Sequence, residues 1–545
     1  MFNNIRIFTL LFVLFAGSEV RANSDDAGVS FDLQNHIDQA VDNGQKKIVI
    51  PPGRYRVIPH QRQHLYLHDL EDVDIIADGV EMICTETTRA LTIQDCQRVT
   101  IRGLTIDYDP LPYTQGRIIG LSQDKTVHDI ELFDGYPKSD KVEQFKYEIF
   151  RPDTRTLRFG SYHQFSVKKL APQRIRVTRG GRYMGEEVGD IIVIGTRHAP
   201  GGQSPHAIYV TRSQNVTLDH VTLYASNCFG FFETSCKRNV YRQCVITRRT
   251  EDDFKQREDP RIRSLDADAF HSKHAVVGPQ LIECTAHFQA DDCVNICGDY
   301  HMVMAADGPR LRVLAKGQMN IKPGAPLEIV SYDGRRMPDA RVVTTQRAGR
   351  ISKEERDFMA RQRMHQPFRE GSLHDIYEVG IDRPIDLPRG SVIADANQTG
   401  NGFQVTNCDF GFNRSRGILI KASHGTISGN KLQGCHGEAI KVSPEYWWLE
   451  AGSSNDLQII GNEIRDCQGK GIAVYALNAS GRISPVGAHN RIVIKDNQIT
   501  AVKDTDIWVT STKGLVLKNN RLDDEGSEVK LEQCEDVQID EIDKP

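Results

Sequence analysis

The chain has 545 residues, with 44 glycines, 22 prolines and a formal net charge of −5. A single core stops growing at about 250–300 residues, so a chain of this length either divides into domains or grows by repetition. Lysine and arginine are dispersed and form no basic stripe, so a nucleic-acid partner is not expected.

The first 22 residues have the anatomy of a secretory signal peptide. Arg6 precedes an apolar run from Ile7 to Ala16, and small residues follow up to Ala22. That pattern is typical of export signals, and the run is too short to span a bilayer. We therefore expect cleavage near Ala22 and export to the periplasm or the extracellular space, with no transmembrane segment after signal removal.

Residues 31–57 predict a cap for a repetitive β structure. Leu33, Ile37, Ala40 and Val41 share one side of a short amphipathic helix, and a strand follows at 48–50. A helix placed there covers the open end that a stack of β coils would otherwise expose. This beginning resembles that of pectin-lyase-like β-helix enzymes.

Nearer the C-terminus one sequence pattern recurs, which is a run of β-forming residues followed by asparagine. The asparagines are Asn407, Asn430, Asn462, Asn497 and Asn520, separated by 23, 32, 35 and 23 residues. A step of 23 is too short for a βαβ unit, which needs about 30 residues. It suits one coil of a parallel β-helix, in which neighbouring coils pair about 4.8 Å apart.

Two segments, 109–199 and 299–395, break the coil rhythm with alternating β runs and turn signals. We interpret them as two small antiparallel β-barrels inserted into an all-β, right-handed parallel β-helix. Residues 350–370 of the second insertion are charged, and a solvated linker is favoured there over a substrate lid. The expected division is 1–22 signal peptide, 23–108 cap and first coils, 109–199 inserted barrel, 200–298 central coils, 299–395 second barrel, and 396–545 C-terminal coils.

The chain has 12 cysteines, many at equivalent coil positions. Stacked free thiols inside the coils are favoured over a disulfide framework, which is the alternative.

Asp268 and Asp292 are separated by 24 residues, about one coil, so the repeat predicts that they stack. Asp291 precedes Asp292 and faces another way, because side chains alternate along a strand. Three carboxylates this close cannot all ionise freely, so one should keep a raised pKa. Glycoside hydrolysis needs that combination of a protonated carboxyl and an ionised one. Capping of turns is the alternative, and it is favoured for Asp266.

The following coils continue the same face and supply candidates for substrate binding. Charged candidates are Arg416, Lys421, Glu438 and Lys441, for which solvated rim charges are the alternative. Trp447 and Trp448, followed by Glu450, interrupt the next coil. Aromatic rings can pack against the apolar face of a sugar, although core tryptophans remain an alternative. His271 and His274 are expected to orient or pack near the acids, with His271 counted among the binding candidates.

Asp268, the pair Asp291–Asp292 and the basic segment 416–421 resemble the motifs of polygalacturonases. That match is partial, because Ala267 departs from the usual context and Ser423–His424–Gly425 follows the basic segment. The closer resemblance is to glycoside hydrolase family 110, the exo-α-1,3-galactosidases that remove terminal galactose from blood-group-B-type glycans. It rests on the capping segment, both insertions and the stretches 265–273, 289–297 and 438–450.

The resemblance implies an inverting, metal-independent hydrolase of an oligosaccharide or glycoconjugate, with no cofactor. Asp291 would be the general acid, and Asp268 with Asp292 would hold and deprotonate the attacking water. Linear Galα1-3Gal is a second candidate substrate, and the oligomeric state is open, with a homodimer as one alternative. The competing functions are a Ca²⁺-dependent polysaccharide lyase, a polygalacturonase-like hydrolase and a non-catalytic glycan-binding β-helix.

Overall fold

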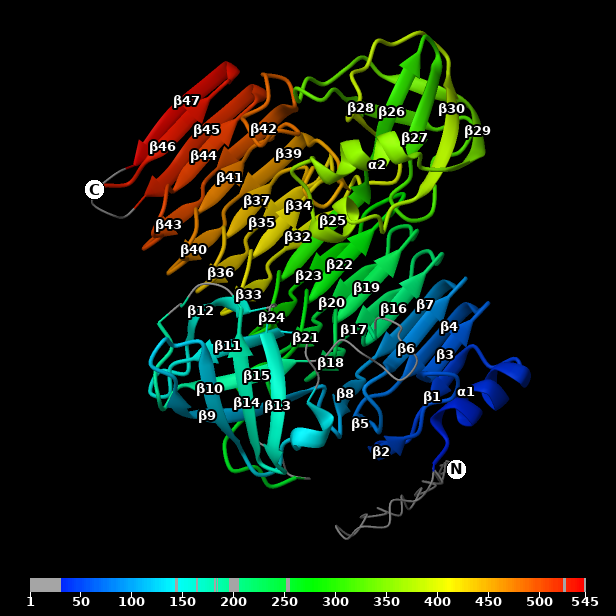
Figure 1. Ribbon diagram of the computed structural model, residues 1–545. Coiled ribbons are helices and arrows are strands. Elements are labelled where there is room, and N and C mark those ends of the chain that lie inside the picture. The colour runs from blue at the N-terminus through cyan, green and yellow to red at the C-terminus, as the bar shows by residue number, and fades with distance from the viewer. Residues whose placement is uncertain are drawn as a thin grey trace, which may run out of the picture.

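The computed structural model describes residues 31–142, 146–162, 165–180, 183, 185–195, 205–250, 255–522 and 526–543. The expected signal peptide, 1–22, lies outside the described residues. Most of the described chain winds into a parallel β-helix, in which each coil contributes strands to three ladders (Figure 1). We name the ladders sheet 1, sheet 2 and sheet 3, after the strands with which they begin.

Sheet 1 contains β1 (Lys47–Val49), β4 (Glu71–Ile76), β7 (Gln97–Arg102), β17 (Thr217–Asp219), β20 (Val240–Arg242), β23 (Gln280–Ile282), β32 (Gln404–Thr406), β35 (Thr426–Ser428), β39 (Asn455–Ile460), β42 (His489–Lys495), β45 (Thr512–Leu522) and β47 (Glu535–Asp543). Sheet 2 contains β2 (Gly53–Val57), β5 (Val80–Cys84), β8 (Thr105–Tyr108), β18 (Thr222–Leu223), β21 (Val245–Ile246), β24 (Thr285–His287), β33 (Asp409–Gly411), β36 (Lys431–Gln433), β40 (Glu463–Arg465) and β43 (Gln498–Thr500), which pairs with the end of β45.

Sheet 3 contains β3 (Gln63–His68), β6 (Arg89–Gln94), β16 (Ile208–Thr211), β19 (Phe231–Thr234), β22 (Phe270–Lys273), β25 (Val294–Asp299), β34 (Ile418–Ile420), β37 (Ile440–Val442), β41 (Ile472–Val474), β44 (Ile507–Thr510) and β46 (Val529–Glu532). The short strand β38 (Glu450–Ala451) pairs antiparallel with the end of β25.

Side chains alternate along each strand, and those that point inward form the core of the β-helix. Along β42, Ile492 and Ile494 point inward and are buried, whereas Arg491 is exposed and Val493 is partly exposed. One apolar cluster built this way extends from Leu33 to Leu522. The predicted cap is confirmed, because α1 (Leu33–Asp42) begins at the N-cap Asp32 and buries Leu33, Ile37 and Ala40.

The first insertion contains β9 (Tyr113–Leu121), β10 (Val127–Leu132), the 3₁₀ helix η1 (Ser139–Lys141), β11 (Lys146–Phe150), β12 (Leu157–Tyr162), β13 (Phe165–Ala171), β14 (Arg174–Arg179) and β15 (Ile191–Gly195). Its described strands pair as an antiparallel sheet in the order β12-β11-β15-β9-β10-β14-β13, with a core of its own. In the described part of the chain no pairing joins β12 to β13, so this sheet is open where we expected a barrel.

The second insertion is the closed barrel that the sequence predicts. It contains β26 (His301–Asp307), β27 (Arg310–Leu314), β28 (Pro326–Val330), β29 (Ala340–Arg350), β30 (Asp375–Ile381) and β31 (Val392–Asp395), closed in the order β26-β27-β30-β29-β28-β31. The charged segment 350–370 forms α2 (Lys353–Ala360) and α3 (Gln366–Arg369). Helix α2 begins with a capping box between Ser352 and Glu355, which explains why this polar segment is helical.

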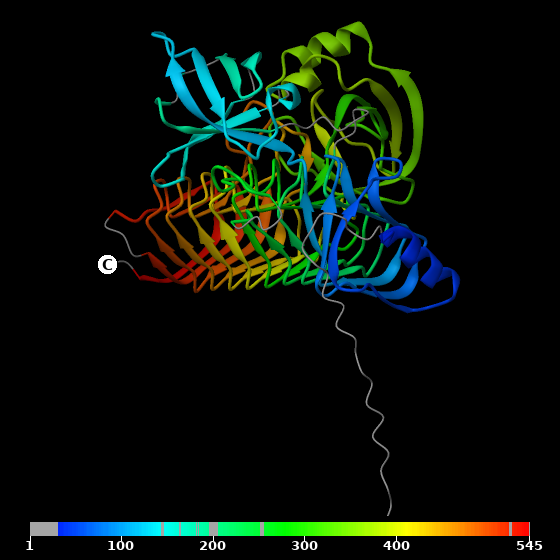
Figure 2. The same ribbon diagram turned by 90° about the horizontal axis from the view of Figure 1, so that it is seen from below.

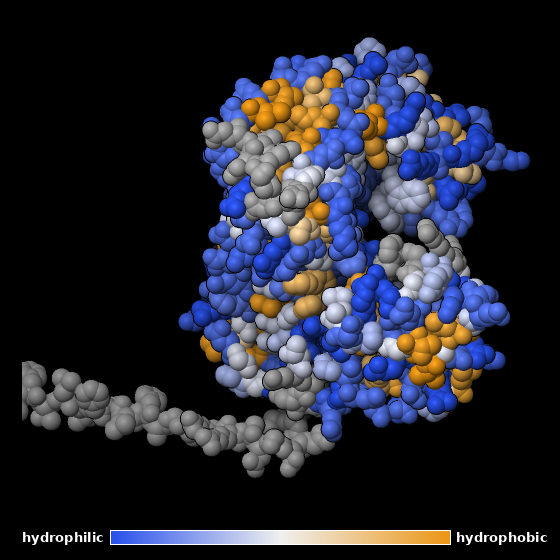
Figure 3. All heavy atoms as spheres, turned by 90° about the vertical axis from the view of Figure 1, so that its left-hand side faces the viewer, coloured by the Kyte–Doolittle hydropathy of each residue, from blue (hydrophilic) through white to orange (hydrophobic). Residues whose placement is uncertain are grey.

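Both insertions lie on the same side of the β-helix (Figure 2). The space-filling view shows them as two lobes with a hollow between them (Figure 3). No helix among the described residues is long and apolar enough to cross a membrane.

All 12 cysteines are free thiols, and 11 of them are buried, which confirms the preference for inward cysteines. The asparagine register needs one correction. Asn430, Asn462, Asn497 and Asn520 stack as expected, but the preceding position in the ladder is Cys408, whose backbone N–H donates to the side chain of Asn430. Asn407 is exposed and has φ of 54°, a corner conformation that asparagine tolerates better than most residues.

Candidate active site

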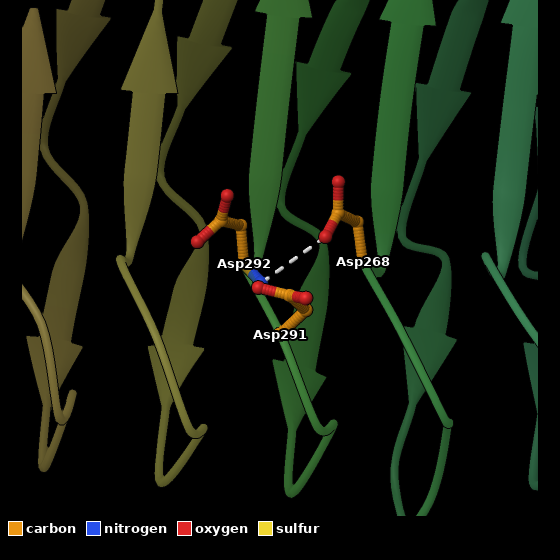
Figure 4. Close-up of side chains that lie close together, drawn as sticks. All are labelled: Asp268, Asp291 and Asp292. Carbon is orange, nitrogen blue, oxygen red and sulfur yellow. Dashed lines mark hydrogen bonds between the residues drawn. The ribbon is translucent and has the colours of Figure 1, made fainter. Parts of the chain in front are cut away.

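Asp268 and Asp292 occupy equivalent positions on adjacent coils, just before β22 and β25. Phe270 pairs with Val294, so a 24-residue offset holds through both strands. The backbone N–H of Ala269 donates to the carbonyl of Asp292 at 2.9 Å, and the N–H of Asp292 donates to the Asp268 carboxylate at 3.3 Å (Figure 4). The predicted stacking is confirmed.

Asp291 extends in a different direction from the stacked pair, and its carboxylate lies in front of them (Figure 4). One oxygen of each of the three carboxylates lies within 4.8 Å of the others. The three side chains differ in exposure, at 24% for Asp291, 7% for Asp268 and 2% for Asp292. Asp291 is therefore the accessible member of the cluster.

The next rungs of the same ladder carry Arg416 and Glu438, as the sequence predicts. The Arg416 guanidinium donates to Asp292 Oδ2 at 2.8 Å, and its backbone N–H donates to Oδ1 at 2.9 Å. The backbone N–H of Gly417 donates to the Glu438 carbonyl at 3.0 Å, which places Glu438 one coil beyond Arg416. The acids are thus continued by a cation and then by another carboxylate.

Burial raises the pKa of Asp292 to about 7, and the charges of Asp268 and Asp291 act in the same direction. Arg416 opposes this effect but does not cancel it. A carboxyl with a pKa near 7 can hold a proton at neutral pH, which is the condition for general acid catalysis. The cluster therefore has the shared proton that three close carboxylates require.

His271 orients Asp268 from the same coil. Its Nδ1 lies 2.8 Å from Asp268 Oδ2, and its ring stacks on Phe229 with centroids 4.5 Å apart. Burial lowers the pKa of His271, but the bond to Asp268 and the nearby Cys297 thiol raise it to about 10. His271 therefore carries a positive charge beside Asp268 at neutral pH. His274 faces elsewhere and bonds to Asp299 at 2.8 Å.

A second charged group lies further along the same face. Lys421 Nζ is fully buried and lies 2.8 Å from Glu450 and 3.1 Å from Glu445, and it donates to Asn295 Oδ1 at 3.2 Å. Lys441 bonds to Glu445 at 2.6 Å. Burial raises the pKa of Glu450, but Lys421 and a neighbouring lysine lower it to about 2, so the carboxylate is ionised. These paired charges form a mostly buried polar network, in which Glu445 and Glu450 keep a small exposed area.

The two tryptophans have different neighbours. Trp448 packs on His365 of the second insertion, with ring centroids 4.2 Å apart. Trp447 is 44% exposed and lines a cleft of about 220 Å³ together with Lys441, Glu445 and Tyr475. The structure therefore places Trp447 beside Lys441 and Glu445, whereas Trp448, which is 38% exposed, lies against the second insertion.

The three aspartates also offer oxygen ligands to a hard cation. Two of them already carry guanidinium partners, because Arg414 contacts Asp291 at 2.5 Å and Arg416 contacts Asp292 at 2.8 Å. A bound Ca²⁺ would have to displace both arginines or accept their repulsion. This donor set fits a metal poorly.

Comparison with known proteins gives two kinds of similarity. A family model described as a right-handed β-helix region matches residues 393–520. Alpha-1,3-galactosidase A of Bacteroides fragilis is 21% identical over 90% of this chain and 84% of its own length. Alpha-1,3-galactosidase B of Bacteroides thetaiotaomicron is 21% identical over 90% of this chain and 82% of its own. The chain is thus similar over nine-tenths of its length to α-1,3-galactosidases. The resemblance expected from the sequence is thereby confirmed.

Among solved structures, the A-module of a mannuronan C-5 epimerase from Azotobacter vinelandii aligns over 93% of each chain, with 10% identity and a TM-score of 0.39. At that TM-score the alignment adds nothing to the argument. The similarity to α-1,3-galactosidases rests on the sequence relatives.

Several residues of this site were missed by sequence reasoning. Arg414 contacts Asp291, and Asn295 contacts Lys421. Lys146, from β11 of the first insertion, donates to the Ala290 carbonyl at 3.1 Å, and burial lowers its pKa to about 8. The coil register could have identified Asn295, which aligns with His271. No repeat signal links Lys146 to the acids, because it comes from an insertion.

Proposed function

We propose that the protein is an exo-acting α-1,3-galactosidase that removes terminal galactose from blood-group-B-type glycans and from linear Galα1-3Gal. One observation carries the proposal. Three carboxylates, one with a pKa raised to about 7, meet on adjacent coils of a chain that is similar over 90% of its length to α-1,3-galactosidases. Export by residues 1–22 to the periplasm or the extracellular space belongs to the same proposal.

In this mechanism Asp291 is the general acid. An exo-acting enzyme encloses the terminal sugar and leaves the rest of the glycan toward solvent, so the group that protonates the leaving oxygen must be accessible. Asp291 is 24% exposed, whereas Asp292 is 2% exposed. Asp268 and Asp292 are deeper and stacked, which suits them to hold one water molecule between them and to take its proton.

The three carboxyls titrate as one coupled unit, so a proton that rests on Asp292 is available to the whole cluster. In the unliganded protein the Arg414 guanidinium contacts Asp291. We propose that the glycosidic oxygen takes over the position beside Asp291 and weakens the contact to Arg414, so that the proton moves to Asp291 before the bond breaks.

The proposed stereochemical outcome is inversion, with water as the nucleophile. The carboxyl groups of most inverting glycosidases are about 6.5–9.5 Å apart, and those of retaining enzymes about 5–5.5 Å. Here one oxygen of each carboxylate lies within 4.8 Å of the others, which is shorter than either separation. The proposed inversion therefore rests on the resemblance to inverting α-1,3-galactosidases and not on this distance. The anomer of the released galactose is therefore the sharpest test of the proposed inversion.

The substrate is tested with a panel of galactosides that differ only in linkage. Purified protein is incubated with α-1,3-, α-1,4- and α-1,6-linked digalactosides and with the branched B-type trisaccharide, and free galactose is measured by chromatography. We expect release from the α-1,3-linked digalactoside and from the branched glycan only. Equal release from all linkages, or release from none, would overturn the substrate assignment.

The division of roles is tested with leaving groups of different acidity. An aryl α-galactoside with an acidic phenol needs little proton donation, so Asp291→Asn should retain most of its activity on it and lose about 10²-fold or more on the digalactoside. Asp268→Asn should lose activity equally on both substrates, because both need the attacking water. If Asp292→Asn instead shows the leaving-group dependence, the acid is Asp292.

A further inference from the structure

A second cleft, separate from the three aspartates, lies between the first insertion and the corner that joins sheet 2 to sheet 3. Its volume is about 730 Å³. One wall is the β11–β12 hairpin with Arg151 and Arg158, and the other is a series of coil corners with Phe288 and Phe412. The proposed function leaves this cleft without a role.

The corner wall is a ladder of planar groups. Register pairs Ile246 with Ala286 and Ala286 with Phe410, so Arg248, Phe288 and Phe412 occupy one position on successive coils. The Arg248 guanidinium lies 4.0 Å from the centroid of the Phe288 ring. The Phe288 and Phe412 rings stack with centroids 5.5 Å apart and planes at 18°.

The ladder ends on an open ring face. Phe412 is 42% exposed, although it is a large apolar residue. The next rung is Gly434, where an added Cβ would lie 2.9 Å from Phe412 Cδ1. Because glycine has no side chain there, the ring is left uncovered on the side of the cleft. An uncovered aromatic ring can receive the apolar face of a sugar.

The backbone of this ladder adopts the left-handed corner conformation that recurs along the β-helix. Phe288 has φ of 66° and Phe412 has φ of 51°, a left-handed conformation that bulky residues rarely adopt. The following rungs use Gly434 and Asp466, which tolerate it better.

The charged residues that line the cleft are mostly positive. Five lining residues are arginine or lysine, and one is a carboxylate, Asp466. Arg155 and Arg158 have partners, at 2.8 Å from Asp259 and 2.8 Å from Asp190.

The other three cations, Arg151, Arg248 and Lys503, have no ion-pair partner in the described part of the chain. The Nη1 atom of Arg248 is buried and makes no hydrogen bond. Unpaired cations that surround a cleft attract anions, and a guanidinium matches the geometry of sulfate and carboxylate.

We propose that this cleft is a carbohydrate-binding site for an anionic sugar unit, which stacks on Phe412 and places its sulfate or carboxylate near Arg151 and Lys503. The site would hold an acidic segment of the glycan that carries the substrate, or of a neighbouring chain, while the aspartate site acts on the terminal sugar. Binding there needs no turnover, so its failure and the failure of the proposed function are measured separately.

The test is calorimetric titration of the full chain with three tetrasaccharides of equal length, which are a sulfated galactan, an oligogalacturonate and a neutral galactan. We expect at least one anionic tetrasaccharide to bind at least tenfold more tightly than the neutral one, with an affinity that falls as salt increases. The sulfated and uronate arms identify which anionic group the cleft prefers. Equal affinity for the neutral sugar, or no binding of either anion, would overturn the proposal.

Variants locate the binding. Phe412→Asn removes the ring but keeps a residue that tolerates the left-handed corner, and Lys503→Gln removes an exposed charge. Each should weaken binding of the preferred anion about fivefold or more, while hydrolysis of a neutral α-1,3-digalactoside is unchanged. Arg174→Gln, on β14 of the same insertion but outside the cleft, is the matched control and should leave binding unchanged. Binding that survives both cleft variants would place the anion elsewhere and contradict the assignment.

Discussion

The asparagine ladder and the stacked aspartate pair have the same coil spacing, but stacking stabilises the first and brings like charges together in the second. In the asparagine ladder, Asn430, Asn462 and Asn497 each donate from Nδ2 to the side-chain oxygen of the next asparagine, every time at 2.9 Å. An amide offers both donors and an acceptor, so identical residues satisfy each other. Asp268 and Asp292 stack at the same coil spacing, but an ionised carboxylate offers only acceptors.

The aspartate pair is therefore stable only with help from its neighbours. Asp268 is balanced by His271, Asp292 by Arg416, and the cluster retains a proton because burial raises the pKa of Asp292 to about 7. The same spacing that strengthens the fold in one ladder creates a reactive group in the other. A local loss of stability at such a position is typical of a functional site.

The largest expected effect comes from neutralising the aspartate pair. Asp268→Asn should reduce hydrolysis of the α-1,3-digalactoside by about 10²-fold or more, because the water loses its base. The melting temperature should change by only a few degrees, since one repulsive charge and one ion pair are lost together. The assay is initial rate against thermal unfolding. Unfolding that accompanies the lost rate would mean that the acids are structural.

The reverse substitution should damage the other ladder. Asn462→Asp removes the donors to Asn497 and to the Ile427 carbonyl and places a buried carboxylate against oxygens. We expect a loss of about 2–5 kcal/mol in the free energy of unfolding, measured with urea.

Asn407→Asp is the matched control for that experiment. Asn407 is exposed and outside the ladder, so the expected change is within about 0.5 kcal/mol. A large loss at Asn407 would show that the register assigned to this coil is wrong.

The dependence of stability on pH separates the two ladders, because only the aspartates titrate. The folded-state pKa of Asp292 is raised from its ordinary value of 3.8 to about 7. The folded state therefore binds more protons than the unfolded state between these values, and stability falls as pH rises from about 4 to 7.

We expect that fall to be about 4 kcal/mol, and to disappear in Asp292→Asn. His271, with its pKa raised from 6.5 to about 10, adds a further fall at alkaline pH. Urea unfolding at a series of pH values measures both. An Asp292→Asn variant whose stability follows the wild-type curve between pH 4 and 7 would contradict the account.

The smallest expected effect is that of metal removal. Because Arg414 and Arg416 already neutralise two of the three aspartates, a chelator should leave the hydrolysis rate unchanged, and added Ca²⁺ should not raise the melting temperature. Loss of activity in chelator, together with an unsaturated product that absorbs in the ultraviolet, would favour the lyase alternative instead.

The sequence predicted those features that depend on the repeat. The 24-residue step between Asp268 and Asp292 fixes their stacking, and the same register places Glu438 one coil beyond Arg416. The repeat also misled at Asn407, because a corner asparagine one residue early is indistinguishable from a ladder asparagine when only spacing is known.

Contacts made by the insertions could not be predicted in this way. Lys146 reaches Ala290 across 144 residues, and Trp448 meets His365 of the second insertion. Such contacts depend on how a separate sheet packs on the coils, which no periodicity encodes. The open first insertion has the same origin, since alternating runs indicate antiparallel strands but do not show whether the first and last strands pair.

The central claim is that Asp291 protonates the leaving oxygen while Asp268 and Asp292 direct water to the anomeric carbon. Proton NMR of the first turnovers on the branched B-type trisaccharide and on Galα1-3Gal tests it most directly. The account predicts that β-galactose appears first from both glycans and then mutarotates to the equilibrium mixture. Initial appearance of α-galactose would contradict it, because retention requires a carboxylate, and not water, to attack.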